Sequence, residues 1–184
     1  NGTLHIHEDL GKDIIQIPAE MLLPAKDDQT DADLRDLIDF TFSDMPTGQL
    51  QSENEDGYYE RCGRYFQSKA LLTPKNVDVE IINRHVLQSL PGEKISFLSA
   101  DSISVGDDNE MRYPVEFLNS LEVSGLPPHQ LTVKVGAVLM CLRNISMHDG
   151  LCNGTRFILT KATSRVLHGI IINGSAKGCS VVIP

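Results

Sequence analysis

Residues 131–142 read LTVKVGAVLMCL, and this apolar, β-branched run indicates the fold of the C-terminal part of the chain. Three shorter apolar runs follow at 157–162, 166–172 and 179–183, and segments rich in Gly, Asn and Ser separate them. We expect one long strand over 131–142, with Gly136 as a bend or bulge, followed by three short strands. Four strands joined by tight turns predict a small antiparallel barrel or meander.

Upstream of this β-rich part, residues 69–90 predict a strand, a turn and a helix. Residues 70–73 are apolar without alternation, so we expect a short strand that is buried on both faces. Either Thr73 or Asn76 is expected to cap the helix that follows. The apolar positions of this helix recur at helical spacing: Val79, Ile82, Val86 and Leu90. A Pro-Gly pair ends the helix. Such a strand–turn–helix unit is typical of an α/β layer.

The other segments predict a mixture of helix, strand and loop. We expect extended chain over 1–24, a helix over 31–44 and a strand over 94–103. A short helix is expected over 113–121, and an exposed acidic loop over 47–60.

Charge divides the chain into two different parts. The net charge of the 184 residues is -9, which argues against a simple cationic nucleic-acid binder. Eleven acidic residues and one basic residue lie between Asp27 and Glu60, whereas residues 131–184 hold six basic residues and one acidic residue. The C-terminal part therefore carries +5 and the remainder carries -14, so we expect the two parts to meet different partners.

Neither cysteines nor Asn-x-Ser/Thr sequences establish a secreted protein. The four cysteines form no C-x-x-C pair, so free thiols are favoured over disulfides or a metal site. Three of the four Asn-x-Ser/Thr sites read Asn-Gly-Ser/Thr, and Asn-Gly is also a turn dipeptide. No run of about 18 apolar residues predicts a membrane span. The first residues show no basic region and no apolar core, so we expect no signal peptide.

No catalytic centre or metal site is predicted by the residues. The chain has no G-x-x-x-x-G-K-[ST] phosphate loop and no acidic pair placed to hold Mg²⁺. Two places could instead contact a phosphate backbone, namely the turn before the second helix and the segments that flank one hairpin loop. A capped helix and ordinary turn residues explain the same patterns without DNA. The candidate DNA-binding residues are Thr73, Pro74, Lys75, Asn76, Arg143, Asn144, Asn153, Gly154, Thr155 and Arg156.

Several long blocks resemble the petite-integration-frequency (Pif) family of DNA helicases. Residues 71–83 are similar to the family's segment L-A-P-T-N-x-D-V-D-x-I-N, and residues 97–102 resemble the strand after it. Residues 113–129 resemble the block Y-P-T-E-F-L-N-S-L…S-G-L-P-P-H, and residues 131–156 resemble L-K-V-G-A…G-L-C-N-G-T-R. Within this family, the residues of these blocks are most similar to those of the subgroup found in eukaryotic genomes and Helitron-type transposons.

This resemblance implies a motor that moves 5′ to 3′ on single-stranded DNA and unwinds duplexes with ATP and Mg²⁺. It implies an α/β plus all-β fold, with a partial second RecA-like domain over 69–130 and an inserted barrel of the Src-homology-3 type over 131–184. Residues 1–68 would be a linker and helical segment that leads into the RecA-like domain. The first motor domain's motifs are absent, so we expect a fragment that binds no nucleotide and is inactive alone.

The implied setting is DNA repair, recombination, replication or telomere maintenance, in the nucleus or also in mitochondria. The implied partners are single-stranded and forked DNA, with no membrane, and the oligomeric state stays open. Two alternatives remain: a non-catalytic module that binds proteins or, weakly, single-stranded DNA, and a secreted glycosylated β-rich domain.

Overall fold

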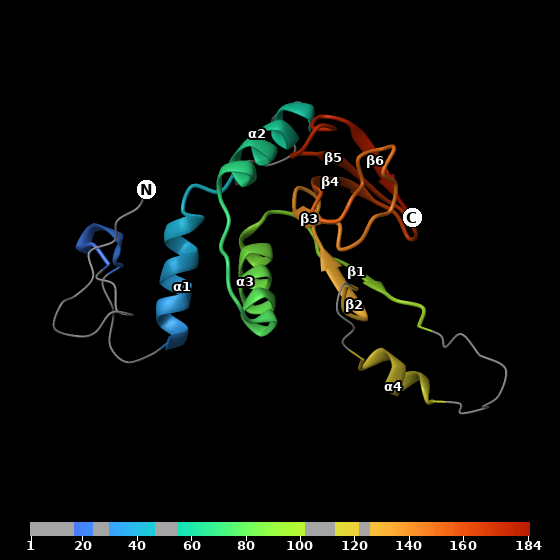
Figure 1. Ribbon diagram of the computed structural model, residues 1–184, viewed down its shortest axis with the longest axis horizontal. Coiled ribbons are helices and arrows are strands. Elements are labelled where there is room, and N and C mark those ends of the chain that lie inside the picture. The colour runs from blue at the N-terminus through green and yellow to red at the C-terminus, as the bar shows by residue number, and fades with distance from the viewer. Residues whose placement is uncertain (1–16, 24–29, 47–54, 102–112, 122–125) are drawn as a thin grey trace, which may run out of the picture. The chain divides into compact units, whose positions relative to one another are not determined.

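The computed structural model describes residues 17–23, 30–46, 55–101, 113–121 and 126–184. The chain divides into two compact units, residues 1–41 and residues 42–184, and each is described by itself. The second unit holds all the described β-strands (Figure 1).

The first unit contains one helix and one short helical turn. Helix α1, Thr30–Thr41, confirms the helix expected over 31–44, although it ends three residues earlier. Within the segment 1–24, residues 1–16 and Pro24 lie outside the described residues. The rest of that segment includes the 3₁₀ turn η1, Ala19–Met21, where we had expected extended chain.

Helix α2, Glu55–Ser68, begins the described helices of the second unit and corrects our expectation of an acidic loop over 47–60. Residues 55–60 form its first turns, and residues 47–54 lie outside the described residues. Aromatic and sulfur side chains recur along one face of α2 and are buried: Tyr58, Tyr59, Cys62 and Phe66. Burial of this stripe stabilises the helix although its sequence begins with acidic residues and includes two glycines.

Helix α3, Asn76–Ser89, confirms the helix expected after the turn at 73–76. The strand expected at 70–73 is wrong: these residues form no strand, and the side chain of Leu72 is 96% exposed. A strand needs a neighbour to satisfy its backbone groups, and none of the described strands pairs with this segment.

A two-stranded ribbon follows α3. Strand β1, Ile95–Leu98, lies within the strand expected over 94–103 and pairs antiparallel with β2, Gln130–Val133. Helix α4, Val115–Asn119, confirms the short helix expected over 113–121. The described strands contain no parallel pair, so the RecA-like assignment of 69–130 stays a prediction.

The remaining strands form one antiparallel meander in the order β3-β4-β5-β6. These strands are β3, Val138–Met140; β4, Arg156–Ala162; β5, Leu167–Ile171; and β6, Ser180–Ile183. This arrangement confirms the meander. Because β3 and β6 are edges of an open sheet in the part of the chain that the structure describes, the barrel of the Src-homology-3 type stays a prediction.

The strand expected over 131–142 is in fact two strands, β2 and β3, in different sheets. Gly136 separates them with φ +88°, a left-handed conformation that side chains other than Gly adopt rarely. A Cβ atom there would lie 2.9 Å from the Tyr58 hydroxyl oxygen, so the aromatic side chain of α2 also requires a glycine. The turn is closed by a hydrogen bond from Ala137 N to Lys134 O at 3.0 Å.

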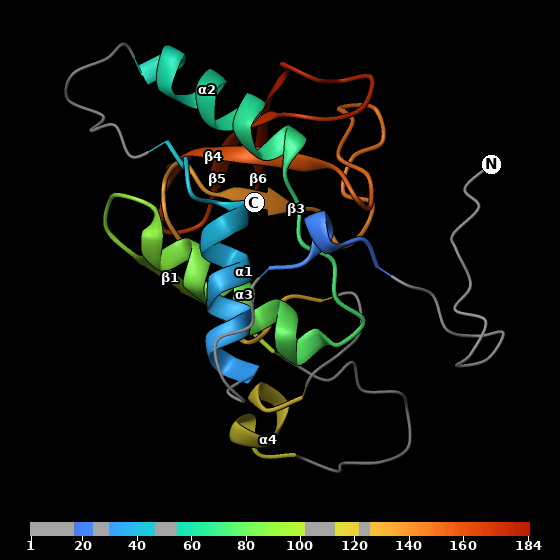
Figure 2. The same ribbon diagram turned by 90° about the vertical axis from the view of Figure 1, so that its left-hand side faces the viewer.

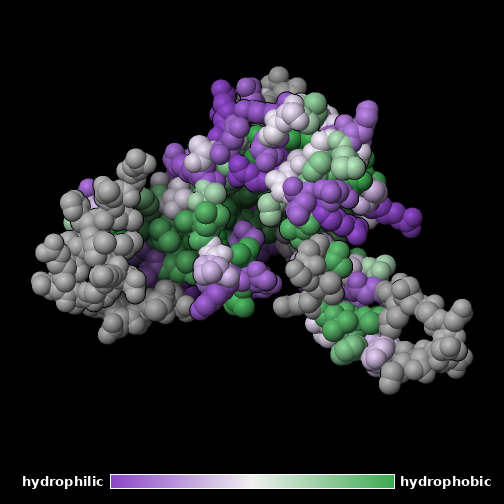
Figure 3. All heavy atoms as spheres, viewed as in Figure 1, coloured by the Kyte–Doolittle hydropathy of each residue, from purple (hydrophilic) through white to green (hydrophobic). Residues whose placement is uncertain are grey.

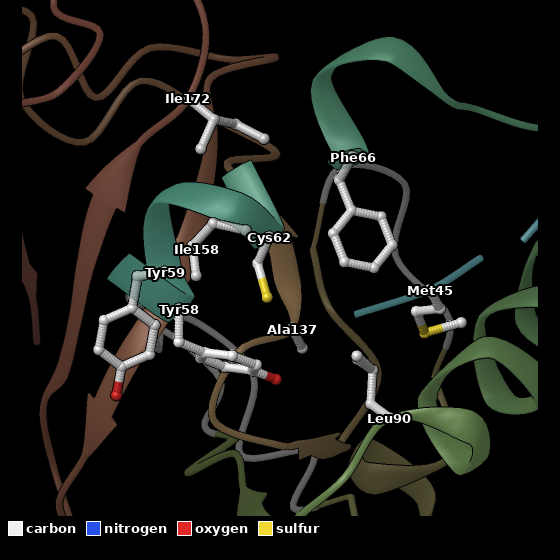
Figure 4. Packing of buried hydrophobic residues seen from close by; sticks show 9 residues of the cluster. All are labelled: Met45, Tyr58, Tyr59, Cys62, Phe66, Leu90, Ala137, Ile158 and Ile172. Atoms are coloured by element: carbon white, nitrogen blue, oxygen red, sulfur yellow. The ribbon is translucent and has the colours of Figure 1, made fainter. Parts of the chain in front are cut away.

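Helix α2 lies across one face of the meander and forms the main core with it (Figures 2 and 4). In this core, Tyr58 and Cys62 of α2 pack with Ile158 of β4 and with Leu90, which follows α3. Gly63 allows the close approach, because a Cβ atom there would lie 3.2 Å from a methyl carbon of Ile172. The opposite face buries a second cluster: Cys141, Leu151, Phe157, Ile171 and Val181.

The four cysteines are free, as expected. Burial raises the pKa of the Cys62 and Cys141 thiols. These two side chains therefore belong to the apolar cores, where a neutral thiol behaves as a small hydrophobic group.

Candidate nucleic-acid interface

The turn from Thr73 to Asn76 lies directly before α3. Thr73 Oγ1 donates a hydrogen bond to Asp78 Oδ2 at 3.1 Å and accepts one from Lys75 N at 3.3 Å. Lys75 occupies the N-cap position without a side-chain cap, so neither Thr73 nor Asn76 caps the helix as expected. The Asp78 carboxylate in the first turn already complements the helix dipole and lowers the attraction of this end for a phosphate.

The second predicted site is the neck of the loop between β3 and β4. Asn153 N donates to Asn144 Oδ1 at 2.9 Å, and Gly154 N donates to Cys141 O at 2.8 Å. These bonds bring Arg143 and Asn144 together with residues 153–156, as the sequence predicted for the two sides of one hairpin loop. The predicted turn role of Asn-Gly is confirmed here, because Gly154 has φ +84°.

Two of the predicted residues in this neck have their side chains engaged within the fold. Thr155 Oγ1 donates to Gly150 O at 2.8 Å and accepts from Cys152 N at 3.1 Å. Arg156 Nη1 donates to Phe66 O at 3.2 Å, near the C-terminal end of α2. These contacts give both side chains a structural role, and their predicted contact with DNA stays a prediction.

Arg143, Asn153 and Gly154 form the accessible part of the neck. All three are exposed, and no atom lies within 4 Å of the position that a Cβ of Gly154 would occupy. An arginine beside an open backbone is suited to a phosphate group, since the guanidinium pairs with phosphate oxygens and the glycine permits close approach.

The two predicted sites lie apart. In both views, α3 begins on the side that is farther from the meander (Figures 1 and 2). The loop from β3 to β4, in contrast, is part of the meander. No hydrogen bond or ion pair between described residues joins them. A strand of DNA would therefore contact them as separate points.

Sequence reasoning missed two polar residues that position this region. Lys134 is buried, and its Nζ donates to Leu90 O at 2.5 Å and lies 3.4 Å from Gln88 O, so it satisfies carbonyls at the C-terminal end of α3. Burial lowers the pKa of Lys134, with the charge of Lys94 as a lesser cause. Asn173 Oδ1 accepts from Arg156 N at 2.7 Å. From the sequence alone, Lys134 is only one of the six basic residues of the segment 131–184.

A Ser–His–Asp cluster lies at the end of the β1–β2 ribbon. His129 Nδ1 lies 2.8 Å from Ser99 Oγ and 3.1 Å from Asp101 Oδ2. Both partners share one ring nitrogen, whereas a hydrolytic triad uses the two nitrogens separately. With its amide turned to donate, Asn119 Nδ2 lies 3.1 Å from Asp101 Oδ2, so the cluster links α4 to the ribbon. Among the residues that the structure describes, no group of three His, Cys, Asp or Glu side chains is placed to hold a metal.

A segment that runs from α4 through the β3–β4 neck and into β4 resembles a known protein family. Residues 116–161 match the 2B domain of DNA helicase Pif1. The matched segment is about a quarter of the chain, and it supports a Pif1-like helicase family and a protein related to DNA helicases. None of the curated proteins matches the chain.

Each helix that the structure describes is too short or too polar to cross a membrane.

Proposed function

We propose that this chain is a fragment of an ATP-dependent 5′-to-3′ DNA helicase and supplies part of its second motor domain and single-stranded DNA track. The observation that carries the proposal is the match of residues 116–161 to the Pif1 2B domain. That segment includes the β3–β4 neck, where Arg143 and Gly154 are exposed on adjacent chain segments. The helicase family supports ATP and Mg²⁺ as cofactors of the parent protein.

Nucleotide hydrolysis is assigned to the parent and not to this chain. The sequence lacks the phosphate loop that holds the β- and γ-phosphates in related motors. The resemblance to the eukaryotic and Helitron-like subgroup supports a nuclear or mitochondrial setting and a role in repair, recombination, replication or telomere maintenance. Forked DNA would be the substrate of the whole motor.

Fluorescence anisotropy with a labelled oligothymidylate tests the single-stranded DNA contact. We expect weak binding at low salt, and we expect Arg143→Ala to reduce it and to flatten the dependence on salt by roughly 0.7 for one lost phosphate contact. Arg84→Ala is the matched control, because Arg84 is exposed in the second half of α3 and is not one of the predicted DNA-binding residues. Equal losses for both variants would contradict a site at the neck, and absence of binding at low salt would contradict DNA contact by this chain.

A protein-interaction module is the second candidate. Apolar side chains of α4 and β1 are exposed, among them Val115, Phe117 and Leu98. Figure 3 shows hydrophobic side chains gathered over α4. Exposed apolar patches mark contacts with other proteins, whereas affinity for DNA depends mainly on positive charge. This candidate gains support if the chain fails to bind the oligonucleotide.

A further inference from the structure

The six basic side chains of residues 131–184 are not equally available to a ligand. Lys134 and Arg156 donate to helix carbonyls, and Lys177 Nζ donates to Gln67 Oε1 at 2.9 Å. The other three are exposed and make no hydrogen bond or ion pair with any described residue: Arg143, Lys161 and Arg165. Two of these three, Lys161 and Arg165, lie on the β4–β5 hairpin, outside the DNA-binding residues predicted from the sequence.

A β-bulge in β4 determines which way Lys161 faces. Leu159 pairs with Gly169, but the next paired residue of β4 is Lys161, opposite His168, so Thr160 is the extra residue. Thr160 Oγ1 donates to His168 O at 3.1 Å, and Thr160 O accepts from the Tyr59 hydroxyl at 2.9 Å. Bulges of this type redirect side chains. Without it, Thr160 would face His168, and Lys161 would lie on the other face of the sheet.

The bulge places two nitrogen-bearing side chains side by side on one face of the sheet. Directly opposed residues of antiparallel strands have Cβ atoms about 5 Å apart. Arg165 lies in the adjoining turn, which is closed by a hydrogen bond from Val166 N to Thr163 Oγ1 at 3.1 Å. Residues 150–184 contain no Asp or Glu, so no carboxylate of the hairpin neutralises these groups.

Lys161 and His168 line a groove of about 850 Å³ on this face of the sheet. Its lining residues also include Ser180 and one acidic residue, Glu93, in the segment before β1. Lys161 is therefore the basic residue on the hairpin side of the groove, and Glu93 is the acidic residue among those that line it.

We propose that the β4–β5 hairpin binds backbone phosphates of single-stranded DNA through Lys161 and Arg165, with His168 beside them. The inference rests on the proposed function and adds a contact surface to the β3–β4 neck. Charge complementarity carries it: a polyanion meets two unpaired cations on a hairpin without carboxylates. Such contacts read the phosphate backbone and not the bases.

Anisotropy titrations with the labelled oligothymidylate on the full chain test the proposal. The test variant is Lys161→Ala/Arg165→Ala. The control, Arg64→Ala/Arg84→Ala, removes the same charge from exposed positions of α2 and α3. A third variant, Glu93→Gln, removes the opposing carboxylate, and because it should gain affinity it cannot be mistaken for a folding defect. Circular dichroism verifies that each variant is folded.

We expect the hairpin variant to bind roughly five- to tenfold more weakly than the parent and to lose about 1.4 from the salt slope. The control should stay within about twofold, and Glu93→Gln should bind about two- to threefold more tightly. Equal affinities of the hairpin and control variants, with no gain from Glu93→Gln, would overturn the proposal.

The outcomes also separate this inference from the proposed function. Loss of affinity in Arg143→Ala alone would overturn the hairpin site and leave the neck as the DNA contact. Loss in the hairpin variant alone would support the hairpin and overturn the neck. Absence of binding by the parent at low salt would overturn both.

Discussion

Arg156 and Lys134 illustrate how charged residues of the β-rich part serve the helices next to it. The last carbonyl groups of a helix lack intrahelical donors and carry partial negative charge. Arg156 reaches Phe66 O in α2, and Lys134 reaches Leu90 O, directly after α3. Their positive charges therefore stabilise the contact between helices and sheet, and a count of basic residues overstates what remains for DNA.

At the residue scale we predict that Arg156→Ala destabilises the chain. The change removes the donor to Phe66 O and a cation at the C-terminal end of α2, so the free energy of unfolding should fall by about 1 kcal/mol. Urea denaturation followed by circular dichroism measures this change.

Arg143→Ala is the control for that measurement. Arg143 is exposed and makes no hydrogen bond with a described residue, so its loss should change the unfolding free energy by less than about 0.5 kcal/mol. Equal destabilisation by the two variants would contradict the structural role of Arg156.

At the scale of elements, the contact of α2 with the meander decides how the second unit is built. Tyr58 lies against the turn at Gly136, and Gly63 lies against Ile172. The helix therefore contributes both an aromatic side chain that fills space and a glycine that allows close approach. Interiors packed at this density tolerate added methyl groups poorly.

We predict opposite responses from the two glycines of α2. Gly63→Val should lower the free energy of unfolding by about 2 kcal/mol, because the new side chain meets Ile172. Gly57→Val should be neutral or slightly stabilising, because no atom lies within 4 Å of its Cβ position and valine is a better helix former than glycine. Thermal and urea denaturation of both variants would show this difference, and similar losses would contradict the packing of α2 on the sheet.

At the scale of the whole molecule, the second unit unites elements that lie far apart in the sequence. Its main core combines Met45, residues of α2, Leu90 and Ile158, so it forms only when these segments meet. None of the segments that meet in this core is a phosphate loop, because the sequence contains no such motif.

The prediction at this scale is that the purified chain does not release phosphate from ATP, with or without single-stranded DNA. In-line phosphoryl transfer needs a phosphate cradle and a held Mg²⁺, which the sequence does not provide. A phosphate-release assay with a complete DNA helicase as the positive control checks this. Turnover above background that follows the protein through a final gel-filtration column would refute it.

Local sequence patterns were sufficient for several elements. The helical spacing of apolar residues predicted α3 and α1, and Pro114 followed by a short apolar segment predicted α4. The Asn-Gly dipeptides predicted turns, because both residues tolerate positive φ. Each of these features depends on neighbours within a few residues, which the sequence displays directly.

The sequence patterns failed where distant partners decide the structure. Residues 55–60 look like an acidic loop, but Tyr58 and Tyr59 are buried against the sheet and hold them in α2. The run 131–142 looks like one strand, but its two halves pair with β1 and β4 in different sheets. An apolar segment at 70–73 without a partner stays outside any strand.

The candidate site divides in the same way. The sequence by itself determined that Arg143 and residues 153–156 flank one loop and that the C-terminal part is basic. Only the tertiary structure decided that Arg156 and Lys134 donate to helix carbonyls and that Lys161 shares a face with His168. Residue type and spacing determine charge and turn propensity. The direction of a side chain depends instead on the register with a neighbouring strand, or on a hydrogen bond to the end of a helix that is distant in the sequence.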